Sequence, residues 1–127
     1  MATSTLAKTT LKSKVAWNNS NPTEAFGAQT ISTGFSNIKG ITIRYREYAT
    51  TTREFNVTIF GDESRVDGKL DGFTFTSTPY VYYLRPFIFI PSNGDVSFQL
   101  CYPMTAFGSY GNGDNSYAVP TQIIVYY

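Results

Sequence analysis

The chain has 127 residues, with ten basic and nine acidic side chains, a net charge of +1 and no histidine. This length suits one domain that can bury a core, while a near-neutral charge without a lysine or arginine cluster argues against a nucleic-acid partner. Because histidine is absent, imidazole acid–base catalysis, a Ser-His-Asp triad and histidine-ligated zinc are excluded.

The single cysteine, Cys101, rules out an intrachain disulfide and is typical of a protein made in a reducing compartment. It lies within an alternating segment, so we expect a small buried hydrophobe rather than a reactive thiol. No apolar run approaches the roughly 18 residues of a membrane helix, so we expect no membrane insertion. We also expect no cofactor and no metal site.

Apolar and polar residues alternate with a period of two along much of the chain, whereas helical periodicity is absent. The alternating segments are residues 6–17, 26–32, 37–48, 54–61, 69–76, 80–90, 95–103 and 116–127. Residues rich in turn formers separate them, and the ten Phe and ten Tyr suit a pleated surface. The sequence therefore predicts one all-β domain over residues 1–127, a jelly-roll-like antiparallel β-sandwich of about eight strands.

Alternation also predicts which side chains face the core. The expected core positions are Ile41, Ile43 and Tyr45 in the third segment, Phe55, Val57 and Ile59 in the fourth, and Val96, Phe98 and Leu100 in the seventh. Segment 80–90 is apolar at nearly every position, which indicates burial on both faces, and its Pro86 indicates an edge position or a bulge. Gly72 predicts a bulge in segment 69–76.

A polar spacer, residues 18–25, lies between the first two segments, with Trp17 before it and Phe26 after it. We expect Trp17 to plug one end of the core beside Phe26. The Asn and Ser side chains of the spacer satisfy turn backbone groups, and Pro22 fixes one φ angle, so the spacer sets the angle between two strands.

The order of the strands predicts which loops lie together. In an antiparallel sandwich successive strands run in opposite directions, so their connections alternate between two ends. The connections after the first, third, fifth and seventh segments then share one end, which we call the distal end, opposite both chain termini. The distal end is expected to carry the two longest polar loops, residues 18–25 and 106–115.

The loop 106–115 and its C-terminal flank are the strongest candidates for recognition of another molecule. Tyr110 and Tyr117 can stack on sugar faces at little entropic cost. Asn112, Asp114 and Asn115 supply adaptable hydrogen bonds, and paratopes use the same mixture of side chains. The alternative is a surface loop without a binding role.

Acidic residues gather in segment 62–71, which contains Asp62, Glu63, Asp67 and Asp71. Their carboxylates could ligate Ca²⁺, but the spacing fails the EF-hand pattern, and a solvated hairpin loop is the alternative. Glycoside hydrolysis needs two acids across a cleft, and no spacing singles out such a pair. We therefore predict a protein that is not an enzyme.

Two motifs resemble a known family. Trp17, Asn18, Pro22 and Phe26 belong to a W-N-x-x-P-type turn followed by F-x-A-Q-T-I, and residues 114–127 are similar to an N-N-x-x-x-I-P-x-x-I strand. This pairing resembles small β domains that end many bacteriophage tail and receptor-binding proteins. The resemblance implies a virion structural protein of a tail fibre, baseplate or head, assembled in the bacterial cytoplasm, which serves in receptor binding or capsid decoration.

The resemblance also implies partners. They are further copies of the chain in a homotrimer, other virion proteins and a glycan on the host surface. We expect residues 1–10 to form an N-terminal arm that packs on a neighbour, because a polar terminal segment is ordered only when something ties it down. The alternative function is a stand-alone carbohydrate-binding, lectin-like module.

Overall fold

The computed structural model describes residues 11–50, 53–74, 81–105 and 115–127. The expected arm over residues 1–10 lies outside them. The described residues form nine strands and no helix. The strands are β1 (Ser13–Asn18), β2 (Gln29–Ser32), β3 (Gly40–Tyr48), β4 (Glu54–Phe60), β5 (Val66–Thr74), β6 (Val81–Ile90), β7 (Asp95–Phe98), β8 (Tyr102–Thr105) and β9 (Tyr117–Tyr126).

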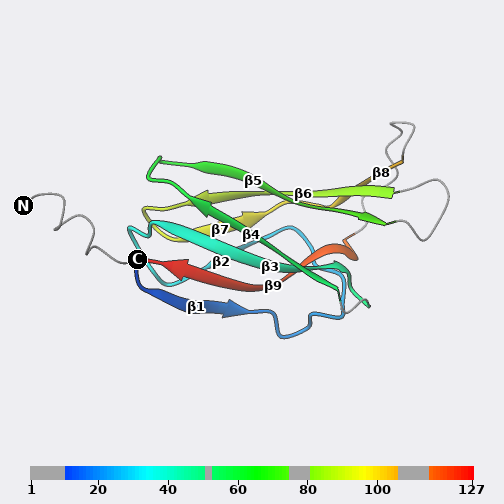
Figure 1. The fold of residues 1–127 in the computed structure, drawn as a ribbon, viewed down its shortest axis with the longest axis horizontal. Helices are drawn as coiled ribbons and strands as arrows, with labels where there is room; N and C mark the ends of the chain where they lie inside the picture. The colour runs from blue at the N-terminus through cyan, green and yellow to red at the C-terminus, as the bar shows by residue number, and fades with distance from the viewer. Residues whose placement is uncertain (1–10, 51–52, 75–80, 106–114) are drawn as a thin grey trace, which may run out of the picture.

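The strands make two antiparallel sheets that lie one over the other (Figure 1). The first sheet has the order β1-β9-β3-β4, and the second has β2-β7-β6-β5 with β8 also paired to β6. Period-two alternation lets each sheet place its apolar side chains in the layer between them. The predicted all-β antiparallel sandwich is therefore confirmed.

Strands β7 and β8 follow one another along the same side of β6, since β5 occupies its other side along nearly its whole length. Between them, residues 99–101 lie opposite only Arg85 and Pro86, so the interruption is a bulge. Pro86 accepts a hydrogen bond from the N–H of Gln99 at 2.9 Å but has no N–H to return. Of the two alternatives predicted for Pro86, an edge position is wrong because β6 lies inside the sheet. The bulge is present, and it explains why proline is tolerated in a central strand.

The core contains the inward-facing residues that alternation predicted in β3, with Ile41 and Ile43 fully buried. Phe98 and Cys101 are buried as well, but Leu100 is 42% exposed, so its predicted core position is wrong. The bulge supplies the reason, because one extra residue reverses the faces that follow it. The bulge predicted at Gly72 is also wrong, since β5 and β6 pair without a register shift.

The expected burial of β6 on both faces is wrong for this chain by itself. Tyr83, Arg85, Phe87 and Phe89 point into the core and are buried. The residues between them point to the other side of the second sheet, where they are only half-buried.

Backbone hydrogen bonds bring the connections together at two ends, as strand order predicted. At the terminal end, the N–H of Lys12 donates to the carbonyl of Tyr127 at 2.7 Å. At the distal end, the N–H of Phe26 donates to Asn115 at 2.9 Å, and that of Ala49 donates to Ser116 at 2.8 Å. Figure 1 shows the C-terminus beside the start of β1, with the β1–β2 connection at the opposite end of the sandwich.

Candidate functional site

The distal end holds a polar pocket of about 240 Å³, formed by the spacer that follows β1. Its lining residues are Trp17, Asn18, Asn19, Ser20, Asn21, Glu24, Ala25, Phe26 and Gln29. Most of these are exposed polar side chains at its rim, and Trp17 is a half-buried aromatic side chain among them. The pocket surface is therefore almost entirely polar, which suits a polar ligand that is bound by hydrogen bonds.

The spacer is held in place by its own side chains and by the core beneath it. Asn19 donates to the carbonyl of Pro120 at 2.8 Å and accepts from the N–H of Asn21 at 2.8 Å, which forms an Asx turn. Trp17 packs edge-on against Phe26, with ring centroids 5.9 Å apart. The sequence prediction that Trp17 lies beside Phe26 is confirmed.

A buried arginine, Arg85, holds backbone segments of the distal end together from within the core. Arg85 lies on the inward face of β6, and none of its surface is exposed. Its guanidinium donates to four backbone carbonyls, namely those of Ala118 at 2.8 Å, Gln99 at 3.0 Å, Tyr117 at 3.0 Å and Asn115 at 3.1 Å. These bonds join the bulge after β7 to the start of β9, on both sides of the loop 106–114.

Arg85 also stacks on the residue that follows the spacer, because its guanidinium carbon lies 5.5 Å from the centroid of the Phe26 ring. Burial lowers the pKa of Arg85 to about 10, so the side chain stays charged at neutral pH. No carboxylate in the described part of the chain pairs with it. Four carbonyl dipoles and one aromatic face therefore replace a counterion.

Sequence analysis overlooked Arg85, although alternation places it on the same face as Tyr83 and Phe87. One further constraint acts at the same place, since Ala118 has a φ of 45°, a left-handed conformation that is uncommon for alanine. The bond from the Arg85 Nε–H to the Ala118 carbonyl fixes that residue where β9 begins. Surrounding structure of this kind is what keeps such a conformation populated.

Two of the five predicted recognition residues lie within the described residues. Asn115 is half-buried, and its side-chain oxygen accepts from the N–H of Cys101 at 3.1 Å. Tyr117 is packed between Tyr48 and Tyr83, with ring centroids 4.9 and 4.7 Å away. Both therefore support the base of the loop.

The other three predicted recognition residues are Tyr110, Asn112 and Asp114, which lie outside the described residues. Their role in recognition stays a prediction.

A buried carboxylate and a buried phenol lie next to each other under the distal end. Glu47 pairs through one oxygen with Arg53 at 3.2 Å. Its other oxygen and the Tyr83 hydroxyl are buried without a hydrogen-bond partner in the described part of the chain. Burial, and secondly the Glu47 charge, raise the pKa of Tyr83, so the phenol remains neutral.

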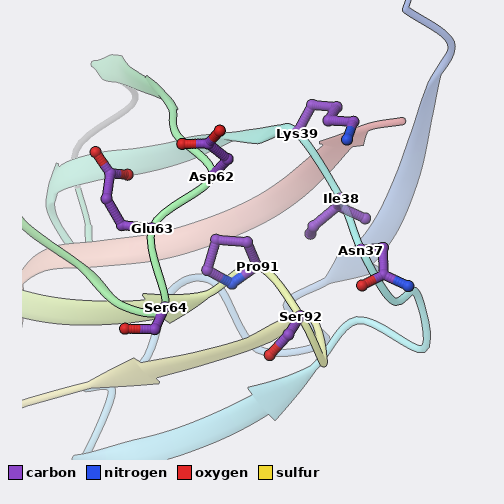
Figure 2. Close-up of a pocket in the computed structure, with 8 residues that line it drawn as sticks. All are labelled: Asn37, Ile38, Lys39, Asp62, Glu63, Ser64, Pro91 and Ser92. Atoms are coloured by element: carbon purple, nitrogen blue, oxygen red, sulfur yellow. The ribbon is translucent and has the colours of Figure 1, made fainter.

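The terminal end has a separate pocket of about 250 Å³, drawn in Figure 2. It lies between the segment before β3, the loop after β4 and the turn after β6. Asp62 and Glu63 line it together with Lys39. In the rest of the acidic segment, Asp67 pairs with Arg65 at 2.9 Å and Asp71 accepts from the Tyr82 hydroxyl at 2.9 Å, so the acids do not converge.

Among the described residues, no three Cys, Asp or Glu side chains gather closely enough to hold a metal ion. The same residues include no helix that is long and apolar enough to cross a membrane. Comparison with known proteins gives no match to a family model, a curated protein or a solved structure.

Proposed function

We propose that this chain is a non-enzymatic structural protein of a bacteriophage virion, which displays its distal end for contact with a host-surface glycan or with another virion component. One observation carries the proposal. The distal end combines the pocket formed by the spacer with the base of the loop 106–115. It lies at the end of the sandwich opposite the start of β1 and the end of β9, which Lys12 and Tyr127 hold together. The motif resemblance points to the same class of protein.

The distal end is suited to recognition because its polar side chains stand on a rigid base. Ser20, Glu24 and Gln29 are exposed around the pocket, while Arg85 and Asn19 fix the backbone beneath them. A preorganised site loses less conformational entropy on binding than a flexible one. Exposed polar groups on a fixed base therefore favour specific binding of a polar ligand.

Adsorption of the protein to host cells or isolated cell-wall glycans tests the proposal. Glu24→Ala, Gln29→Ala and Tyr110→Ala should each weaken binding, by roughly 1–2 kcal/mol if the residue is a hot spot. Asp62→Ala and Glu63→Ala at the terminal end are the matched controls and should bind as the parent does. Equal binding by all five variants would contradict recognition at the distal end.

The second candidate is a stand-alone carbohydrate-binding module, favoured by the polar pocket beside Trp17. Labelled antibodies and electron microscopy of particles from the source distinguish the two functions. Labelling of intact virions supports the structural role. Glycan binding by a protein that is absent from virions supports the lectin-like module.

A further inference from the structure

The outer face of the second sheet carries a stripe of apolar side chains along its central strand. Strand β6 turns alternate residues into the core, so the intervening ones point outward. The outward residues are Tyr82, Leu84, Pro86, Ile88 and Ile90, all half-buried. Tyr102 of β8, which pairs with Leu84 and is 41% exposed, extends the stripe. We call these six residues the β6 stripe.

The β6 stripe differs from the outward positions of β3 and of the middle of β4, although the first sheet also exposes the apolar side chains of Val15 and Phe60. Strand β3 places Thr42 and Arg44 outward, and β4 places Asn56 and Thr58 outward. An antiparallel sheet with one solvated face normally shows this alternation, whereas a strand covered on both faces is apolar throughout. The composition of β6 therefore indicates a second covering layer, which the described part of the chain does not supply.

Beside the β6 stripe the surface has a shallow groove and a row of charged side chains. A shallow groove of about 430 Å³ is lined by Asp67, Gly68, Lys69, Leu84 and Pro86. The outward residues of β5 along this groove are Asp67, Lys69 and Asp71, which pair across the sheet with Ile88, Pro86 and Leu84. Lys69 is exposed and forms no ion pair within the described residues.

The acid–base–acid order of this β5 row is the same in both directions. When the two-fold axis lies between the two sheets and runs across the strands, the β5 row of the second copy faces the same row of the first and runs antiparallel to it. A shift of two residues then places each Lys69 opposite an aspartate of the other copy. Two-fold contacts require this kind of self-complementarity, because the same patch is used on both subunits. An apolar stripe beside a self-complementary charged row thus matches a second copy of the chain.

We propose that the outer face of the second sheet packs against the same face of a second copy, with the β6 stripe at the centre of the contact and Lys69 facing a partner aspartate. This interface goes beyond the proposed function, and its geometry does not depend on glycan binding. It predicts a dimer, whereas the family resemblance implies a threefold assembly.

Sedimentation equilibrium of the full chain at micromolar concentration tests the proposal. The parent should have twice the mass of one chain, and Leu84→Lys or Ile88→Lys should be monomeric. Val15→Lys and Phe60→Lys, at positions 44% and 56% exposed on the first sheet, are the matched controls and should remain dimeric. A monomeric or trimeric parent, or a dimeric Leu84→Lys variant, would overturn the proposal.

Charge reversal gives a test that does not alter the apolar stripe. Lys69→Asp should raise the dimer dissociation constant roughly tenfold or more, because like charges then face each other. The combined variant Asp67→Lys, Lys69→Asp and Asp71→Lys restores an alternating row and should recover dimerisation. Circular dichroism confirms folding of each variant, and an unchanged dissociation constant in Lys69→Asp would refute the two-fold pairing. Glycan adsorption is measured separately, so its loss leaves this result unaffected.

Discussion

Replacement of Arg85 tests whether the buried guanidinium stabilises the distal end. Arg85→Met keeps a long unbranched side chain but removes every donor. The Asn115 carbonyl retains its bond from the Phe26 N–H, and the carbonyls of Ala118 and Gln99 lose the bonds that the guanidinium donates to them. At about 1–3 kcal/mol for each buried acceptor left unpaired, these two carbonyls give a gross cost of about 2–6 kcal/mol.

Removal of the buried charge offsets part of this cost, because a desolvated cation is itself unfavourable by several kcal/mol. We therefore expect Arg85→Met to lower the free energy of unfolding by about 2–4 kcal/mol. Urea denaturation measures this change within the 5–15 kcal/mol range that is typical of a domain. Arg85→Lys should recover only part of the loss, since an ammonium has three donors and no planar fork.

Arg44→Met is the matched control. Arg44 also lies within a strand, but its side chain is 44% exposed and pairs with Glu54 at 3.2 Å on the surface. Such a pair contributes less than about 1 kcal/mol. If Arg85→Met and Arg44→Met changed the free energy of unfolding by the same small amount, a bracing role for Arg85 would be refuted.

Three further predictions concern stability. Gly94→Ala should lower the free energy of unfolding in urea by more than about 1 kcal/mol, since φ is 75° and an added Cβ would clash with the Phe35 carbonyl. Gly27→Ala is the control and should change it little, because a Cβ there meets no atom within 4 Å. Phe98→Ala should lower the free energy of unfolding by about 3–5 kcal/mol, because it opens a cavity in the core. Leu100→Ala should lower it less, since the bulge turns Leu100 outward, and an equal loss would contradict the bulge. Burial, then the Asp71 charge, raise the pKa of Tyr45 to about 12. The unfolded chain ionises this phenol first, near its usual pKa of about 10, so its contribution is lost as the pH rises from 10 to 12. Tyr45→Phe should therefore lose less stability than the parent over that range, as measured by denaturation at each pH.

The period-two pattern was enough to predict the strands and most of their faces. Ile41, Ile43 and Phe98 lie in the core as the pattern requires, because a pleated strand turns successive side chains to opposite sides. The placement of the connections at two ends also follows from strand order alone. Pro86 could be assigned in advance to an edge position or a bulge, since a residue without an N–H interrupts a ladder wherever it occurs.

The tertiary structure decided which side chains are buried where the period-two pattern is interrupted or contains a charged residue. The bulge before Cys101 exchanges the faces of Leu100 and Cys101, and its position depends on how β7 and β8 pair with β6. Arg85 is tolerated inside the sandwich only because carbonyls from residues 14 to 33 positions away converge on it. Local sequence cannot encode such a convergence, since the acceptors are backbone groups common to every residue. Their direction is set only when the two sheets pack.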